Sequence, residues 1–299
     1  MKMLEPEAFL RELFDAALEA ALPAHVVAQA LPPAPQGKVI VLGAGKASAA
    51  MAAAVEQAWP DVDLSGLIVT RDGHGVPTER IEVVEAAHPV PDERGRDGAV
   101  RMLQLARDAG EGDLVLCLIS GGASALASVP APGLSFEQKQ AINTALLESG
   151  APIDEMNAVR KRLSAIKGGR LAAAIAPAKS LTLLISDVPG DSPAVIGSGP
   201  TVTDDADASV AFEIIDRYNI EIPPEIRDIM RDNSSLAQLP EGHEVRLIAT
   251  PYRSLDAAAS VARSRGITPV ILGDCIEGEA REVARAFAGV AKTVSAHAQ

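Results

Sequence analysis

Short runs rich in Val, Ile and Leu alternate along the chain with stretches in which apolar residues recur at helical spacing. The runs fall at 38–42, 66–70, 81–85, 113–119, 181–186, 244–249 and 268–272. Apolar runs of this length are typical of buried strands, whereas the spacing at 7–22 and the alanine-rich stretch at 47–58 indicate helices. Because strands that alternate with helices build parallel sheets, the pattern predicts an α/β fold with helices on both faces.

A polar, turn-rich segment at 233–242, which contains Pro240, interrupts this alternation. A new strand, helix, strand, helix series follows it, so we place a domain boundary near Leu239. Residues 1–239 then form the first domain, and residues 240–299 begin a second, smaller α/β domain. Two strands cannot make a covered sheet of their own, and we therefore expect this second domain to be incomplete.

The charge balance narrows the range of partners. The chain has 40 acidic and 27 basic residues and a net charge of −13, so its average surface repels nucleic acid and anionic membranes. No apolar run approaches the roughly 18 residues that a membrane-spanning helix needs. We expect a cytoplasmic protein that acts on a small molecule, and the sequence is compatible with a homodimer.

The first candidate site is the segment GAGKAS, residues 43–48, which follows the first predicted strand. Gly43 and Gly45 would let backbone N–H groups approach an anion at a helix N-terminus, and Lys46 adds a positive charge. The segment is neither a dinucleotide fingerprint, because Ser48 stands at the third glycine position, nor a Walker A motif, because Ile40 stands at the first. A tight turn with a solvated lysine is the alternative.

The segment SGGAS repeats this arrangement after the run at 113–119. Gly121 and Gly122 free the backbone, and Ser120 and Ser124 supply hydroxyl groups that bind an anion or cap a helix. Two such loops at one sheet edge indicate one polyanionic ligand. Ordinary turn chemistry is again the alternative.

Basic residues gather in AVRKRLSAIKGGRLA, where a continuous helix would place Arg160, Ser164 and Lys167 on one face. Such a face is suited to a phosphate or carboxylate, although charge runs are more often solvated surface. The pair Gly168–Gly169 favours binding, because it predicts a break or a close approach. We expect His74 and His88 to line a pocket at most.

Carboxylates follow the run at 181–186, in SDVPGDSPAVIGSGPTVTDD. Asp187 follows the strand where a hard metal ligand or a general base would be expected, Asp191 lies four residues further on past a Pro–Gly turn, and Ser198 lies in the glycine-rich turn behind them. Asp and Gly beside Pro are also common turn formers. Phosphoryl transfer needs cations, in-line positioning and a proton acceptor, and these segments together supply such groups.

Five segments, in this order, resemble the glycerate 2-kinases that carry a C-terminal MOFRL domain. They are VLGAGKASAAM, HPVPDERG, LCLISGGASALASVPAPGLS, NAVRKRLSAIKGGRLA and SDVPGDSPAVIGSGPTVTDD. The resemblance implies a Rossmann-like first domain and transfer of phosphate from ATP, with Mg²⁺, to the 2-hydroxyl of D-glycerate. It also implies that Lys46 is the active-site lysine, that Ser120, Gly121 and Gly122 form the glycine-rich loop, and that Asp187 and Asp191 belong to the DVPGD motif. On this basis we expect Lys46 to bind the transferred phosphate, Arg160 and Lys167 to bind anions of the substrate or nucleotide, and Asp187 to bind Mg²⁺ or accept the hydroxyl proton.

Two further expectations follow from the resemblance. The family's second domain carries a GRGGRN motif that has no counterpart in these 299 residues, so we expect weak nucleotide binding and poor turnover. Members of the family have also been called hydroxypyruvate reductases, which makes an NAD(P)-dependent reductase the main alternative. A non-catalytic sugar-phosphate binding protein is a third interpretation, because phosphate-binding loops alone can bind without reacting.

Overall fold

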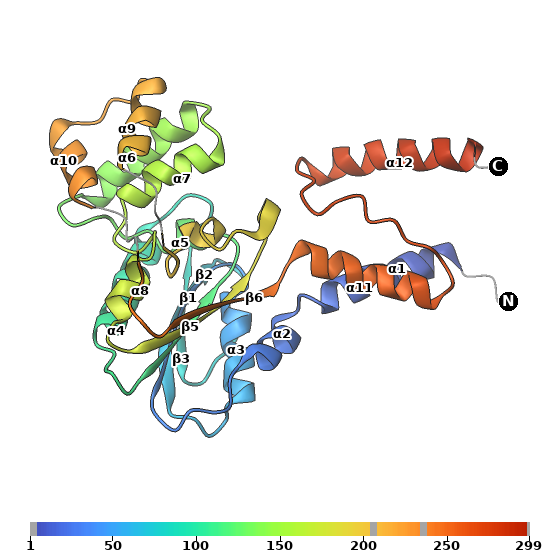
Figure 1. Ribbon diagram of the computed structural model, residues 1–299, viewed down its shortest axis with the longest axis horizontal. Helices are drawn as coiled ribbons and strands as arrows, with labels where there is room; N and C mark the ends of the chain where they lie inside the picture. Colours follow the sequence, from blue (N-terminus) through green and yellow to red (C-terminus); the bar gives the residue numbers. More distant parts are fainter. Residues whose placement is uncertain (1–4, 204–207, 234–237, 298–299) are drawn as a thin grey trace.

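One six-stranded parallel sheet forms the centre of the computed structural model, which describes residues 5–203, 208–233 and 238–297 (Figure 1). The strand order is β3-β2-β1-β4-β5-β6, and every neighbouring pair is parallel. The strands are β1 (Val39–Ala44), β2 (Leu64–Arg71), β3 (Ile81–Ala86), β4 (Leu114–Ile119), β5 (Lys179–Ile185) and β6 (His243–Ala249). The predicted α/β class is confirmed, and the order reverses between β1 and β4, where open α/β sheets bind ligands.

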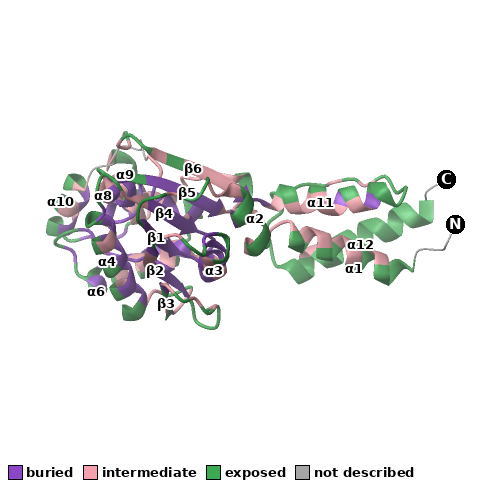
Figure 2. Ribbon diagram, turned by 90° about the horizontal axis from the view of Figure 1, so that it is seen from below, coloured by how far each residue is buried: buried purple, intermediate pink, exposed green. Residues whose placement is uncertain are grey.

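Helices cover both faces of this sheet, and side chains alternate between the two faces along each strand. Leu42 and Val69 pack with α4, α5 and α8 on one face, whereas Val41 and Ile68 pack with α2 and α3 on the other. Figure 2 shows the resulting buried band through the strands. The helices are α2 (Pro23–Ala30), α3 (Ser48–Ala58), α4 (Glu93–Arg107), α5 (Ala123–Leu126) and α8 (Arg170–Ile175).

Four helices form a separate cluster beside α5, at the end of the sheet where the candidate loops lie (Figure 1). Its core includes Leu146, Val159 and Met230, and it has no buried residue in common with the two sheet layers. The helices are α6 (Phe136–Glu148), α7 (Ile153–Arg162), α9 (Ala208–Arg217) and α10 (Pro224–Asp232). Two short 3₁₀ turns, Pro189–Asp191 and Ile196–Ser198, connect β5 to this cluster.

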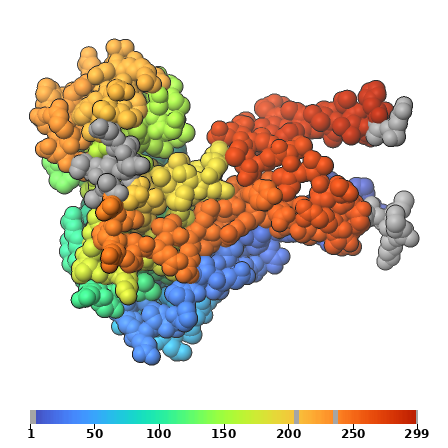
Figure 3. Space-filling view, viewed as in Figure 1, coloured from blue at the N-terminus to red at the C-terminus, as the bar shows by residue number. Residues whose placement is uncertain are grey.

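The remaining helices extend away from the sheet. Helix α1 (Pro6–Glu19) packs along α11 (Pro251–Ser264), and α12 (Ala280–His297) has no buried residue (Figures 1 and 2). The space-filling view shows the same extension beside the compact body (Figure 3). Among the described residues, no helix combines the length and the apolar character that a bilayer span requires.

The end of the chain differs from the sequence prediction in two respects. The strand expected at 268–272 does not form: Val270 and Leu272 are 78% and 69% exposed, and the segment lies away from any sheet edge with which it could pair. Strand β6 lies beyond the boundary expected near Leu239, yet it pairs with β5 in the first sheet. The division of the chain into two domains stays a prediction, and parts of the segments at 233–242 and 201–205 lie outside the described residues.

Candidate active site at the carboxyl edge of the sheet

The loops after β1 and β4 are hydrogen-bonded to each other at the centre of this edge. The Lys46 N–H donates to Gly121 O at 2.8 Å, and the Ala47 N–H donates to Ser120 Oγ at 3.0 Å. Ser120 therefore caps α3 from a neighbouring loop, a role that α3's own N-cap residue, Ala47, cannot fill. Ser48 Oγ donates to Leu118 O at 2.9 Å and fixes the start of α3 on β4.

These contacts change the prediction for the first glycine loop. The Gly45 N–H donates to Val69 O at 3.1 Å, so the amides of Gly45, Lys46 and Ala47 already have protein acceptors and cannot also hold an anion. Gly43 lies within β1, where a β-carbon would collide with Leu118 O. The first loop thus presents the side chain of Lys46, and its glycines serve the close approach of neighbouring strands and loops.

The second loop keeps its backbone donors available. Among the described residues, no atom accepts a hydrogen bond from the N–H of Gly121 or Gly122. Gly121 is buried, and a β-carbon there would collide with the carboxylate of Asp187. This close approach, rather than turn geometry, requires glycine at position 121. The expected backbone cradle for an anion therefore belongs to SGGAS and not to GAGKAS.

Lys46 and Asp187 meet above this loop. Lys46 Nζ lies 2.9 Å from Asp187 Oδ2, and the two side chains are 37% and 46% exposed. They come from the loops after β1 and β5, on either side of β4. The structure thus brings together a lysine side chain, a carboxylate and two free backbone amides between β1 and β4, where the strand order of the sheet reverses. An exposed ion pair of this kind contributes little to the stability of the fold, so the two side chains are available for binding or catalysis.

His88 joins this group from the loop after β3. A β-carbon on Gly122 would lie 2.9 Å from His88 Nε2 and 3.5 Å from Lys46 Cε, so the imidazole and the lysine chain both border Gly122. Burial, assisted by the nearby positive charge of Lys46, lowers the pKa of His88 below its ordinary value and keeps the ring neutral at pH 7. His74 Nδ1 lies 3.2 Å from Lys46 O.

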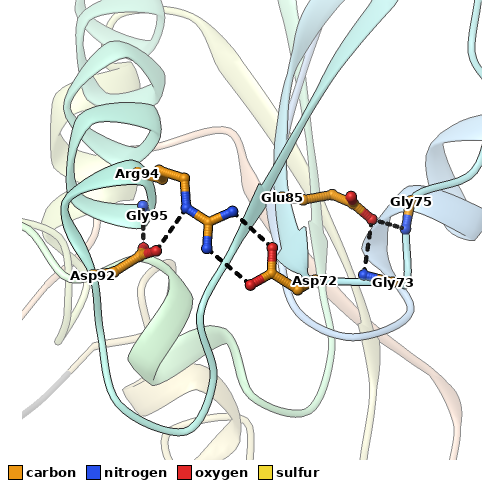
Figure 4. Close-up of polar contacts among 7 residues, drawn as sticks. All are labelled: Asp72, Gly73, Gly75, Glu85, Asp92, Arg94 and Gly95. Carbon is orange, nitrogen blue, oxygen red and sulfur yellow. Dashed lines mark hydrogen bonds and ion pairs between the residues drawn. The ribbon is translucent and has the colours of Figure 1, made fainter.

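A polar network fixes the two loops that carry these histidines (Figure 4). Arg94 binds both oxygens of Asp72 at 2.8 Å, and its Nε donates to Asp92 Oδ2 at 2.8 Å. Asp92 also caps α4 by accepting from the Gly95 N–H at 3.0 Å. Glu85 Oε1 accepts from two amides of the loop after β2, those of Gly73 and Gly75. The loops after β2 and β3 are therefore held to one another and to α4.

A cavity of about 520 Å³ opens beside His88, between the loop after β3 and helices α5, α6 and α7. Its cationic side chains are Lys139, Arg160 and Lys167. A larger hollow of about 840 Å³ lies between α9 and α10 and contains none of the predicted site residues. The cavity beside His88 is thus the one that adjoins the Lys46–Asp187 pair.

Arg160 and Lys167 reach this cavity by a route that differs from the predicted one. Helix α7 ends at Arg162, so the two residues do not share a helical face. Instead the chain leaves the helix after Arg162, and Ser164 Oγ accepts from the Lys167 N–H at 3.3 Å in the turn that follows. Gly168 and Gly169, with φ of 61° and 80°, then turn the chain into α8. Lys167 Nζ donates to Ser124 Oγ at 2.5 Å, and Ser124 Oγ lies 2.9 Å from Ser198 Oγ. Both predicted serines therefore lie beside the lysine.

Lys139 is the site residue that sequence reasoning missed. It lies on α6 with only 3% of its surface exposed, and burial lowers the pKa of its amine to about 7. A signal for it does exist, because Phe136, Ile142 and Leu146 lie at helical spacing and Lys139 falls within this apolar stripe. A lysine in register with buried apolar residues indicates a buried amine.

Asp191 remains apart from this group of contacts. It ends the first 3₁₀ turn with φ of 52°, and its Oδ1 is buried without a hydrogen-bond partner among the described residues. A buried carboxylate oxygen without a donor is costly unless a ligand satisfies it. Asp191 therefore has a free coordination or hydrogen-bonding position, as a cation ligand requires.

Comparison with known proteins agrees with this arrangement. A family model described as "Domain of unknown function (DUF4147)" matches residues 9–231. The chain is 36% identical to the D-glycerate 2-kinase of Thermotoga maritima, covering 98% of this chain and 70% of that protein. It is 52% identical to a "Putative hydroxypyruvate reductase" of Agrobacterium vitis, covering 94% of this chain and 65% of the relative.

A solved structure of glycerate kinase from Thermotoga maritima superposes with a TM-score of 0.86 at 35% identity, covering 96% of this chain and 69% of that one. The chain thus spans about two thirds of the length of these relatives. The family model covers most of the chain, and the relatives agree with it in sequence and fold. The chain therefore belongs to the glycerate 2-kinase family that carries the DUF4147 domain.

Proposed function

We propose that this chain is the main part of a glycerate 2-kinase, which transfers the γ-phosphoryl group of ATP to the 2-hydroxyl of D-glycerate. The observation that carries the proposal is the pairing of Lys46 with Asp187 above the free amides of Gly121 and Gly122. Phosphoryl transfer needs a cation for the phosphoryl oxygens and a base for the hydroxyl proton, and this edge supplies both. The names of the kinase relatives support the choice of substrate.

Each group has a defined task in this proposal. The 2-hydroxyl oxygen forms a bond to the γ-phosphorus, the bond between that phosphorus and the ADP oxygen breaks, and the Asp187 carboxylate accepts the hydroxyl proton. Lys46 and the N–H groups of Gly121 and Gly122 stabilise the negative charge on the phosphoryl oxygens. When ATP binds, Lys46 moves its charge from Asp187 to the phosphate, which frees the carboxylate to act as a base.

Mg²⁺ would supply further neutralisation of the phosphate charge when bound with the nucleotide. No cluster of three or more His, Cys, Asp or Glu side chains suited to a metal occurs among the described residues. Mg²⁺ in such enzymes is usually held by one or two carboxylates together with substrate phosphates, so a cluster is not required. Asp191 would hold it, because its Oδ1 is buried without a partner among the described residues, whereas Asp187 acts as the proton acceptor.

An assay of ADP formation tests the proposal. The full chain is incubated with ATP and Mg²⁺, with D-glycerate, L-glycerate or glycerol as acceptor, and ADP is measured by a coupled enzyme assay. We expect ADP formation that depends on D-glycerate and that Asp187→Asn lowers by at least about 100-fold. Equal ADP formation with and without D-glycerate would contradict the proposal.

A reductase is the second candidate, because relatives that are 52% and 54% identical carry the name hydroxypyruvate reductase. The first loop argues against it. A dinucleotide fingerprint needs a third glycine for close helix packing, and Ser48 fills this position with its hydroxyl bonded to Leu118 O. Enzyme-dependent, stoichiometric oxidation of NADH by hydroxypyruvate would favour the reductase, and its absence alongside ADP formation would favour the kinase.

A further inference from the structure

The cavity beside His88 concentrates positive charge in an enclosed place. Lys139 from α6 and Lys167 from the turn before α8 are each only 3% exposed, and Arg160 from α7 completes the group. Basic side chains that are buried together normally have acidic partners nearby.

None of the described residues that line the cavity is an aspartate or a glutamate. Lys139 Nζ donates to Val129 O at 2.9 Å, Lys167 Nζ to Ser124 Oγ and Arg160 Nε to Asn143 Oδ1 at 2.7 Å, and all three acceptors are neutral. Buried cations are normally paired, because removing an isolated charge from water costs several kcal/mol. This cavity thus keeps basic groups and their N–H donors available for a bound anion.

The electrostatic behaviour of the three groups agrees with this interpretation. Burial lowers the pKa of Lys139 and Arg160, and burial together with Lys139, Arg160 and Lys161 lowers the pKa of Lys167 well below its ordinary value. The charged groups that face Lys139 are Lys167 and Arg160, with the neutral His88 at the cavity rim. An anion placed among them would reverse these shifts.

The cavity is continuous with the proposed transfer centre. His88 and Gly122 both line it, and both border Lys46. A short acid whose carboxylate lies among the three cations would therefore direct a neighbouring hydroxyl group toward Lys46 and Asp187. Ser128, Thr144 and Gln140 offer neutral polar groups to the rest of such a molecule.

We propose that the cavity formed by Lys139, Arg160 and Lys167 binds the carboxylate of a small 2-hydroxy acid, and that Lys139 determines the preference for an acid over a neutral polyol. This inference rests on the proposed kinase function, because it identifies the acceptor half of the same site. The alternative anion, the triphosphate of the nucleotide, requires a metal ion and water around it. Two cations that are almost fully buried suit a compact carboxylate better.

Proton uptake follows from the same geometry. A bound carboxylate restores the charged form of Lys139, so binding near pH 7 to 9 takes up protons from solution. The affinity for the acid should therefore fall as the pH rises above about 7. Binding of a neutral amide of the acid should show neither effect.

The test compares Lys139→Met with Lys38→Met, an exposed lysine at the opposite edge of the sheet. Isothermal titration in buffers of different ionisation enthalpy measures affinity and proton uptake for D-glycerate, D-glyceramide and ATP. We expect Lys139→Met to weaken D-glycerate binding by about 10- to 100-fold, to reduce proton uptake and to change ATP affinity by less than about twofold. Lys38→Met should behave as the unmodified chain.

Several outcomes overturn the inference. These are a Lys139→Met chain that binds D-glycerate normally, one that loses ATP affinity equally, or an unmodified chain that binds D-glycerate no better than D-glyceramide. Because methionine removes an uncompensated buried cation, the variant should unfold at the same or a higher temperature, so lost binding would not reflect unfolding.

Failure of the kinase proposal is separately visible. Loss of D-glycerate binding in Lys139→Met without ADP formation by the unmodified chain would retain the carboxylate site and reject the kinase. ADP formation with an unchanged KM for D-glycerate in the variant would retain the kinase and reject the carboxylate site.

Discussion

The two halves of the site handle charge in opposite ways. Lys46 and Asp187 are exposed and neutralise each other at 2.9 Å, whereas Lys139 and Lys167 are buried and meet only neutral acceptors. Because Lys46 and Asp187 are partly exposed, their ion pair changes the free energy of folding little, and the two side chains can rearrange around a nucleotide. The second half is unfavourable until an anion enters it. Substitutions in the first half should therefore alter turnover alone, and substitutions in the second should alter stability and binding together.

The largest effect is expected for Lys46→Met. Removal of the cation from the transfer centre should lower turnover by at least about 100- to 1000-fold, because it removes charge stabilisation at the phosphoryl group. The unfolding temperature should change by less than about 2 °C, since the ion pair is exposed. Turnover and thermal unfolding are measured on the same preparation. A large loss of stability with retained turnover would contradict the expectation that the Lys46–Asp187 pair affects turnover alone.

Gly121→Ala should follow, with a loss of turnover of about tenfold or more. Its new β-carbon would displace the Asp187 carboxylate from Lys46. Gly112→Ala is the matched control, because that position has open space around it. If both variants keep full activity, the contact between Gly121 and Asp187 has no part in positioning the base.

The pH dependence of stability tests the buried half. The pKa of Lys139 is about 7 in the folded chain and near 10.4 when unfolded, so the unfolded chain binds more protons between these values. The contribution of Lys139 therefore destabilises the fold fully below pH 7 and is relieved as the pH rises, by at most about 1.4 kcal/mol per pH unit. Denaturant unfolding at pH 7 and pH 9 should show a smaller rise for Lys139→Met; an equal rise would place a charged partner near Lys139.

The smallest effect is expected for Arg94→Ala, which loosens the network of Figure 4. We expect a two- to fivefold increase in KM for the acceptor, because the loop that carries His88 is held less firmly. This fold-change corresponds roughly to the free energy of an exposed ion pair. Arg285→Ala removes an exposed pair on α12 and should leave KM unchanged. Equal KM values for the two variants would remove the network from substrate positioning.

Much of the fold could be predicted, because the central strands of a parallel sheet are apolar runs buried on both faces. The runs at 81–85 and 244–249 contain charged residues and form the two edge strands, β3 and β6. The run at 268–272 did not form a strand, because Pro269 removes a backbone donor and because the segment has no neighbouring strand with which to pair. The same dependence on partners explains why β6 joined the first sheet. Pairing is a property of the whole fold that local composition does not contain.

The site was predictable where position along a strand determines it. Lys46, Gly121 and Asp187 follow three adjacent strands, so the parallel order alone brings them together. Arg160 and Lys167 were grouped correctly but by a helix that ends before Lys167. Lys139 was missed because sequence reasoning did not use the apolar stripe of α6, although Lys139 lies within it at helical spacing from Phe136 and Ile142.

The most direct test of the central claim is the identity of the product. The full chain is incubated with ATP, Mg²⁺ and D-glycerate, and ³¹P NMR distinguishes 2-phosphoglycerate from 3-phosphoglycerate. The site predicts 2-phosphoglycerate, because a carboxylate held by Lys139, Arg160 and Lys167 directs the adjacent hydroxyl toward Lys46 and Asp187. Formation of 3-phosphoglycerate, or of no phosphorylated acid after prolonged incubation, would contradict the account.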